Sequence, residues 1–216
     1  MVAPLLVFPE IDLGAARLFF DPIGHGFPFR SHPLGEFARK TVPVILFALA
    51  ALVALAGLAA ALRKRDVAGI SPRMAAFVVA SLALGPGLVV NTILKDHWGR
   101  ARPSTIAEFT PPAQQASAFH YTLPLMPSDQ CQDNCSFPSG HAALGFWTLS
   151  FALLAPPRRR RKAVTAALGF GLLMGLVRMA QGGHFLSDVA FSGIIVVGLT
   201  LWLHRTIVDR SMKNYS

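Results

Sequence analysis

The sequence predicts an all-α fold, a polytopic membrane helix bundle that forms a single domain over residues 1–216. Hydrophobic residues make up 53% of the chain, and the mean hydropathy is +0.48. Charged residues make up 14%, whereas a soluble domain has about one quarter. Residues 41–62 carry no charge and are longer than the roughly 20 residues that span a hydrocarbon core. Because backbone groups in lipid must be paired within helices or a closed barrel, a helix bundle is expected.

Five transmembrane helices are expected from the apolar segments. In the second, Pro86 lacks a backbone N–H group, so a kink is predicted there. The third ends at Pro156 and Pro157, a pair that stops a helix. Glycines in the last two should let neighbouring helices approach closely. The expected helices cover residues 41–62, 74–94, 140–156, 163–181 and 188–204.

Three basic regions predict how the bundle is oriented: Arg63 to Arg65, Arg158 to Lys162, and the C-terminal tail. With five spans all three fall on one side, which the positive-inside rule makes cytoplasmic. The net charge of +9 is therefore attributed to membrane orientation and not to nucleic-acid binding. The opposite side should face the periplasm or exterior of a bacterial inner membrane, and it holds residues 95–139 and 182–187.

The N-terminal segment, residues 1–40, is expected on the outer side or in the membrane interface. Its apolar start, "MVAPLLVF", is too short for a span and too short for a convincing signal peptide. Two alternatives remain open. Either a first transmembrane helix is shortened, or "AARLFF" at residues 15–20 lies along the interface as an amphipathic segment.

Polar residues gather at three span ends, all on the outer side. They lie in "KDHWGRARP" (95–103), "PSGH" (138–141) and "RMAQGGHFLSD" (178–188). Charged groups at such positions are costly and usually functional. The three cations among them, Lys95, Arg102 and Arg178, only donate hydrogen bonds and suit a phosphate group.

Two further residues of these segments predict anion binding. Ser139 and Gly140 lie where a helix begins, so free N–H groups and the helix dipole should favour an anion there. Gly140 has no side chain to obstruct the approach. Together with the three cations, these residues form a predicted phosphate site.

Two histidines and one carboxylate supply the predicted catalytic chemistry. His184 and Asp188 are four residues apart, so on a helix they would share a face. A carboxylate on one ring nitrogen would leave the other nitrogen of His184 as a nucleophile. His141 could protonate the leaving oxygen as a general acid. The scheme needs no metal; a zinc site of these three residues is a less favoured alternative, because the nearby cations would oppose it.

Cys131 and Cys135 lie in the outer loop, residues 95–139. A disulfide is expected if this loop faces an oxidising compartment. Free thiols and a metal site are the alternatives, and a metal site would need more soft ligands nearby.

The three motifs resemble those of the type 2 phosphatidic acid phosphatase superfamily of membrane lipid phosphatases. That pattern is K-x6-R-P, then P-S-G-H, then S-R-x5-H-x3-D, and this chain departs from it only in having Val177 where the pattern has Ser. The resemblance implies a bundle of six helices with its active site near the outer face. It assigns His184 as nucleophile, Asp188 as its partner and His141 as acid. It assigns phosphate binding to Lys95, Arg102, Ser139, Gly140 and Arg178.

The substrate is expected to be a lipid phosphate monoester or diphosphate. The segment from Ser104 to Phe137 is long for an irregular connection, which often marks function. "GRARPSTIAEF" (99–109) and "CSFPSGHAALGF" (135–146) resemble bacterial lipid A phosphatases. Polyprenyl diphosphate and phosphatidylglycerophosphate remain alternative substrates. A lipid phosphotransferase and a non-catalytic lipid binder or transporter remain alternative functions. No cofactor and no obligate protein partner are expected.

Overall fold

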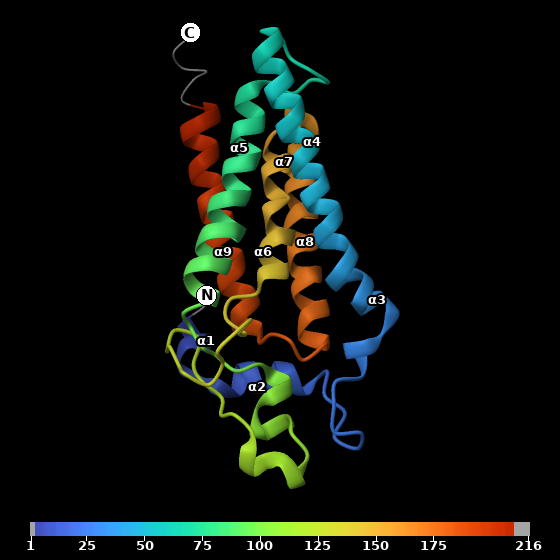
Figure 1. The fold of residues 1–216 in the computed structure, drawn as a ribbon, viewed down its shortest axis with the longest axis vertical. Helices are drawn as coiled ribbons and strands as arrows, with labels where there is room; N and C mark the ends of the chain where they lie inside the picture. The colour runs from blue at the N-terminus through green and yellow to red at the C-terminus, as the bar shows by residue number, and fades with distance from the viewer. Residues whose placement is uncertain (1–2, 210–216) are drawn as a thin grey trace.

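The structure is a computed structural model that describes residues 3–209 of the chain. Within that range every element is helical and no strand forms, so the predicted all-α class is confirmed. Among the described residues, four helices are long and apolar enough to cross a membrane: Pro33–Arg63, Pro72–Lys95, Pro157–Ala180 and Leu186–Asp209. They run roughly side by side along the long axis of the molecule (Figure 1). The polytopic prediction therefore holds, but the count of five spans is not confirmed.

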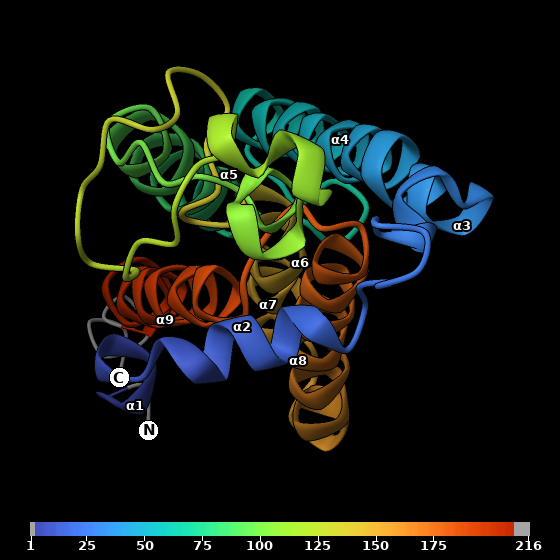
Figure 2. The same cartoon turned by 90° about the horizontal axis from the view of Figure 1, so that it is seen from below.

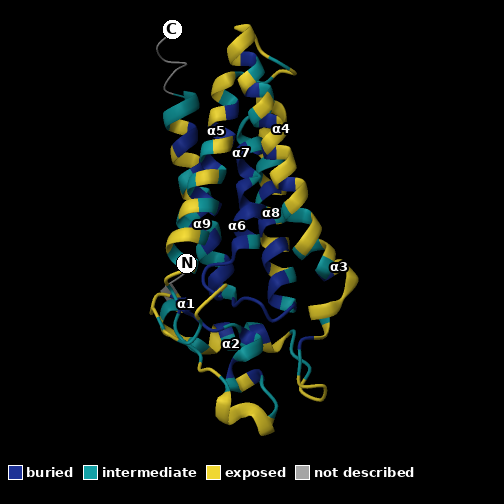
Figure 3. Ribbon diagram, in the orientation of Figure 1, coloured by how far each residue is buried: buried dark blue, intermediate teal, exposed yellow. Residues whose placement is uncertain are grey.

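The third predicted span, residues 140–156, is divided into two short helices. They are α6 (Gly140–Trp147) and α7 (Leu149–Leu153), separated at Thr148, whose hydroxyl donates to the Gly145 carbonyl oxygen at 2.7 Å. Both lie among the long helices of the bundle (Figure 1), and most of their residues are buried (Figure 3). This segment is therefore enclosed mainly by protein, while the long helices around it present their apolar faces outward.

The first span begins earlier than predicted. α3 (Pro33–Glu36), a π-helical turn η2 (Phe37–Thr41) and α4 (Val42–Arg63) run on as one helix. The prediction of residues 41–62 followed the uncharged run alone, whereas the helix continues through charged residues. On α4, Leu55, Leu58 and Leu62 are more than half exposed, as expected of side chains that face lipid.

The second span consists of α5 (Pro72–Leu82) and the π-helical segment η3 (Ala83–Lys95). The change from α- to π-helical pairing occurs three residues before Pro86, the predicted kink position. A π-helix uses more widely spaced backbone pairs, and such segments often occur at functional sites. The Asn91 amide donates to the Pro86 carbonyl oxygen at 2.7 Å, which satisfies that group.

The last two spans extend further than predicted. α8 (Pro157–Ala180) starts with Pro157 in its first turn, where proline is tolerated because that N–H has no partner. α9 (Leu186–Leu203) continues as the π-helical segment η7 (His204–Asp209). The predicted close approach at glycines is present: a Cβ on Gly145 would lie 2.8 Å from the Gly171 Cα.

The N-terminal segment lies across one end of the bundle. The N-terminal helices are α1 (Ala3–Val7) and α2 (Pro9–Arg17). Seen from below, α2 lies in front of α9 and α8 (Figure 2). Asp12 and Ala16 of α2 are buried there. α2 ends at Arg17, within the "AARLFF" run, so the structure does not decide between the two alternatives for this segment. A short 3₁₀-helix, η1 (Pro28–Ser31), follows.

The long loop after η3 covers the same end of the bundle (Figure 1). It contains three short 3₁₀-helices, η4 (Pro103–Thr105), η5 (Ala107–Phe109) and η6 (Pro112–Ser117). Within this loop Cys131 is bonded to Cys135 as a disulfide, with the Cα atoms 5.6 Å apart. Loop and N-terminal helices together form a cap over this end of the molecule.

Candidate active site

The three predicted motifs meet beneath this cap. Lys95 ends η3, Gly140 begins α6, Arg178 lies in the last turn of α8, and Asp188 lies in the first turn of α9. Their four helix termini point to the same end of the bundle (Figure 1). The loop between α4 and α5, which carries the first basic block, lies at the opposite end (Figure 1). The sequence prediction that these motifs share one end is therefore matched by the fold.

His184 is 1% exposed and lies just before α9. Its Nδ1 is 2.6 Å from the Ser136 carbonyl oxygen and 3.6 Å from Asp188 Oδ2. A carbonyl oxygen only accepts, so Nδ1 carries the proton and Nε2 keeps its lone pair. Within residues 3–209, Nε2 is buried and has no hydrogen-bond partner. This nitrogen is the one available to act as a nucleophile.

The surroundings of His184 keep its imidazole neutral. Burial lowers the pKa of His184 to about 3, and the positive charges of Lys95 and Arg178 also lower it. The carboxylate of Asp188 acts in the opposite direction without overcoming burial. At neutral pH the ring is therefore unprotonated at Nε2, as nucleophilic attack requires.

Asp188 is fully buried, and its contacts differ from the predicted ones. Oδ2 accepts hydrogen bonds from the Ser136 hydroxyl at 2.5 Å and the Phe185 N–H at 2.8 Å. The prediction placed His184 and Asp188 on one helical face, but His184 precedes the helix and Asp188 reaches back to cap its first turn. Asp188 therefore holds Ser136 and Phe185 in place by hydrogen bonds, and the Ser136 carbonyl oxygen makes the direct bond to the imidazole of His184.

A buried arginine, which the sequence analysis did not select, holds Asp188 from the other side. Arg100 is fully buried and donates to Asp188 Oδ1, to the Ser187 hydroxyl at 2.8 Å, and to Asp12 Oδ2 at 2.9 Å. Asp12 also accepts from the Ser187 N–H at 2.8 Å and the Tyr121 hydroxyl at 3.0 Å. α2 is thereby connected to the start of α9. Arg100 lies inside the "GRARP" run, so its position between two motif residues was the available signal.

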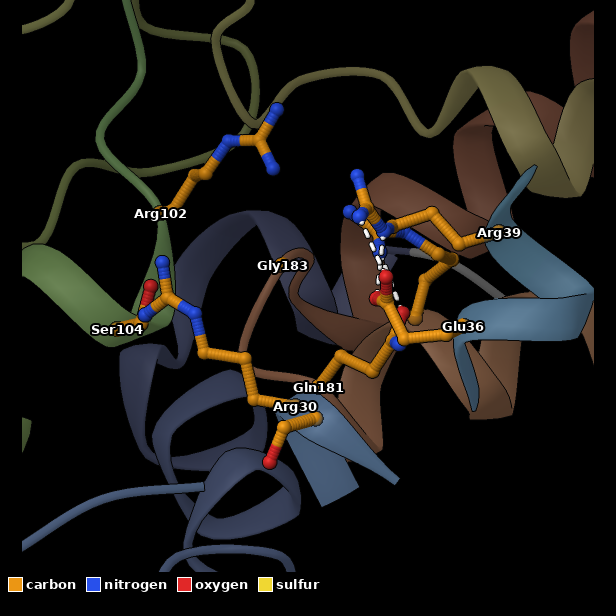
Figure 4. A pocket seen from close by; sticks show the side chains of 9 residues that line it. Arg30, Glu36, Arg39, Arg102, Ser104, Gln181 and Gly183 are labelled. Atoms are coloured by element: carbon orange, nitrogen blue, oxygen red, sulfur yellow. Dashed lines mark hydrogen bonds and ion pairs between the residues drawn. The ribbon is translucent and has the colours of Figure 1, made fainter. Parts of the chain in front are cut away.

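A cavity of about 390 Å³ opens at this end of the bundle (Figure 4). Four arginines line it with a single carboxylate, Glu36, which pairs with Arg39 through Nε and Nη2 at 2.8 Å each. The lining therefore carries a net positive charge suited to an anion. Its residues are Arg30, Ser31, Glu36, Arg39, Arg102, Ser104, Arg178, Gln181 and Gly183.

Two of the predicted phosphate binders lie on the lining of this cavity. Arg102 donates through Nε and Nη2 to the Asn134 carbonyl oxygen, at 3.1 and 2.5 Å. Burial lowers the pKa of Arg102, and the charges of Arg30 and Arg39 lower it further. Arg178 is 6% exposed and donates to the Gln181 side chain, while its Nε is buried without a partner in the described part of the chain. The clustering of these cations favours an anion between them.

The remaining predicted residues are not on the lining of this cavity; His184 directly follows the lining residue Gly183. His141 is half-buried, and its Nε2 is 2.9 Å from the Arg39 carbonyl oxygen, so that nitrogen carries the proton. The buried Ser139 hydroxyl accepts from the Ala142 N–H at 3.4 Å and caps α6. A Cβ on Gly140 would lie 2.7 Å from Asn91 Oδ1. Gly140 therefore packs closely against the Asn91 side chain of η3. Its expected part in phosphate binding stays a prediction.

The zinc alternative requires three ligands grouped together. Within residues 3–209, no three His, Cys, Asp or Glu side chains form a group that could hold a metal ion. His184 Nδ1 and both oxygens of Asp188 are already engaged by protein groups. The structure therefore gives this alternative no support.

A family model described as the PAP2 superfamily matches residues 74–212, which contain all three motifs. The chain belongs to the PAP2 superfamily. This membership confirms the resemblance seen in the three motifs and the prediction of a membrane phosphatase. In the structure the first motif lies at the end of η3 and in the loop after it, the second lies at the start of α6, and the third runs from the end of α8 to the start of α9.

Curated relatives of this PAP2 protein carry one name. It is 38% identical to a lipid A 4'-phosphatase of Francisella tularensis subsp. novicida over 96% of this chain and 90% of that protein. It is 32% identical to a lipid A 4'-phosphatase of Rhizobium leguminosarum over 94% of this chain and 91% of that protein. A Rhizobium etli protein of the same name is 30% identical. No solved structure matches the chain.

Proposed function

We propose that this PAP2 protein is a lipid phosphatase that removes phosphate from lipid A or a closely related lipid through a phosphohistidine intermediate. The observation that supports this most directly is the neutral, buried His184, whose Nε2 has no partner within residues 3–209 and whose neighbour Gly183 lines the arginine-rich cavity. The names of its relatives support lipid A as the substrate. The chain matches at least 90% of the length of the Francisella and Rhizobium leguminosarum proteins, so the similarity extends over nearly the whole of each.

In the proposed reaction Arg102 and Arg178 hold the phosphate, and Lys95 adds a positive charge. Nε2 of His184 attacks phosphorus as the bond to the lipid oxygen breaks. His141 enters this step protonated on both ring nitrogens, with Nε2–H held by the Arg39 carbonyl oxygen, and it gives the Nδ1 proton to the lipid oxygen. The phosphorylated imidazole carries a positive charge while Nδ1 keeps its proton. The Ser136 carbonyl and Asp188 stabilise that charge. The arginines offset the negative charge that gathers on the phosphoryl oxygens in the transition state.

The second half of the reaction restores the enzyme. His141, having lost its proton, takes one from a water molecule, and the oxygen of the hydroxide so formed attacks the phosphorus of phosphohistidine. The P–N bond breaks, its electron pair returns to Nε2, and inorganic phosphate leaves. Side-chain cations supply the charge stabilisation that a metal would otherwise give, so the scheme uses no metal.

The end of the bundle that carries the site is proposed to face the periplasm of a bacterial inner membrane. Supporting this, the loop with Arg63 to Arg65 lies at the opposite end (Figure 1), and basic loops remain on the cytoplasmic side. A lipid phosphate in the outer leaflet would then enter the cavity from the membrane surface.

Phosphate release by the purified protein in detergent tests the proposal. We expect release from lipid A without an added acceptor, which distinguishes hydrolysis from phosphotransfer, and activity that persists in EDTA. Polyprenyl diphosphate, phosphatidylglycerophosphate and phosphatidic acid serve as comparison substrates. His184→Gln should abolish turnover while lipid A still binds, and His120→Gln, a change at an exposed histidine of the loop, is the control.

Labelled phosphate should be trapped on wild-type protein quenched in alkali, and not on His184→Gln. Label recovered on another residue would remove His184 from the role of nucleophile. Full and reversible loss of activity in EDTA would contradict the metal-free scheme.

A further inference from the structure

A second cavity adjoins the phosphate cavity. Its volume is about 470 Å³, compared with about 390 Å³ for the first. Three residues, Arg30, Ser31 and Ser104, line both cavities. The two are therefore neighbouring compartments, and Arg30 lies at their junction, where Figure 4 shows its side chain beside Ser104.

The second cavity is formed by parts of the chain outside the three motifs. η1 and the turn before it supply one wall, and η5 and η6 of the long loop supply the other. Phe109 of that wall is 3% exposed and packs against Phe20 and Phe27, with ring centroids 5.1 and 5.6 Å apart. This wall is thus held in place by the N-terminal segment.

The lining chemistry limits what the second cavity can hold. Its polar groups are the hydroxyls of Ser31, Ser104 and Thr110, the amide of Gln114, the imidazole of His25 and the guanidinium of Arg30, and its apolar surface comes from Phe27, Phe109 and Pro111. No Asp or Glu is among its lining residues, so an ammonium head group would meet one cation and no counter-charge. An acyl chain favours a continuous apolar wall, whereas here the apolar side chains lie among hydroxyl, amide and guanidinium groups. Groups that both donate and accept suit a ligand with several hydroxyls.

We infer that the second cavity binds a sugar of the substrate's head group while the phosphate occupies the first. Arg30 would contact the substrate where the sugar meets the phosphate. The inference rests on the proposed function for the phosphate end, and it adds a separate site for the sugar together with the residues that would select a sugar-bearing head group. A glycerol phosphate lipid would fill only the first cavity.

Blocking the second cavity tests this inference. Gln114→Trp places a large ring at a lining position, and Ala113→Trp adds the same ring at the neighbouring, exposed position that is not on the lining. The substrates are lipid A that carries only its 4'-phosphate, and phosphatidic acid, which has no sugar. We expect Gln114→Trp to lower kcat/KM at least tenfold for the lipid A and less than twofold for phosphatidic acid. Ala113→Trp should change neither.

Binding measurements separate this inference from the proposed function. In a His184→Gln background, which cannot turn over by the proposed mechanism, the affinity for each lipid is measured with and without Gln114→Trp. A loss of affinity confined to lipid A supports the sugar site even if wild-type protein releases no phosphate. An equal effect on both lipids, or no effect on either, overturns the sugar site even if the protein is an active phosphatase.

Discussion

The reactivity of the site depends on which nitrogen of His184 carries the proton. The Ser136 carbonyl oxygen, 2.6 Å from Nδ1, fixes that choice, because a carbonyl cannot donate. Asp188 then holds Ser136 through its hydroxyl at 2.5 Å. A single serine therefore connects the carboxylate to the imidazole, with its carbonyl facing the ring and its hydroxyl facing Asp188.

Stability should fall in acid because His184 is buried in its neutral form. The unfolded chain protonates this imidazole below about pH 6.5, whereas in the folded protein its pKa is about 3. Lower pH therefore favours the unfolded chain, by about 2 kcal/mol between pH 7 and pH 5 from this residue. Thermal unfolding in detergent should show that His184→Gln loses less stability than wild type over this range.

The control for this effect is His120→Gln, because His120 is exposed in the loop. That variant should keep the wild-type dependence on pH. An identical pH dependence in wild type and His184→Gln would mean that His184 is not buried as the neutral form.

At the scale of elements, α2 is part of the structure around the candidate active site and not only a segment that precedes the first span. Asp12 connects α2 to α9 through Ser187 and to the loop through Arg100 and Tyr121. Arg100 also packs over the Phe185 ring, 4.4 Å from its centroid. Since Arg100 lies between Asp12 and Asp188 with no exposure to solvent, each carboxylate offsets part of a buried positive charge.

Removing Asp12 should destabilise the protein strongly. Asp12→Ala leaves the guanidinium of Arg100 buried with only one carboxylate, a change that costs about 3–5 kcal/mol when a buried pair is broken. Thermal or denaturant unfolding in detergent measures the loss. Glu10→Ala is the matched control, since Glu10 lies in the same first turn of α2 and is exposed.

Asp12→Asn should recover part of the stability, because an amide oxygen still accepts from Arg100. Equal stability of Asp12→Ala and Glu10→Ala would show that α2 is not anchored through this carboxylate.

The sequence allowed most of the helices and the three motifs to be predicted, because uncharged runs and charged span ends are local signals. It did not reveal the break at Thr148, since residues 140–155 contain no proline and no Asp, Glu, Lys or Arg that would predict one. The pairing of Asp12 with Arg100 was also missed, because it joins residues 88 apart. The place of Arg100 within the first motif was a signal for that residue, but no local pattern links it to Asp12. Contacts that depend on tertiary packing could not be predicted from local sequence patterns. These contacts surround the predicted site residues.

At the scale of the whole molecule, the apolar outer faces of the long helices suit contact with lipid, whereas the polar ends suit contact with water. Exposed leucines and phenylalanines lie along the long helices, whose outer faces appear in yellow in Figure 3. The cap of α1, α2 and the long loop covers the end with the arginine-lined cavity. This separation matches a protein that is embedded along its length and meets its substrate's phosphate at one membrane surface.

The orientation of the bundle can be tested with single cysteines at its two ends. Ala113→Cys lies in η6 of the cap, and Lys64→Cys lies just beyond α4 at the opposite end; both positions are exposed. The two native cysteines are joined as a disulfide, so they should not react. With a membrane-impermeant maleimide on intact spheroplasts, position 113 should be labelled at once and position 64 only after permeabilisation.

The reverse labelling pattern would place the cavity in the cytoplasm. The phosphatase chemistry proposed for His184 would survive that result, because it depends on the cavity and not on the side. The substrate would then have to be a lipid phosphate of the inner leaflet. Positive-inside charge makes the periplasmic outcome the expected one, since Arg63, Lys64 and Arg65 would otherwise have to cross the bilayer.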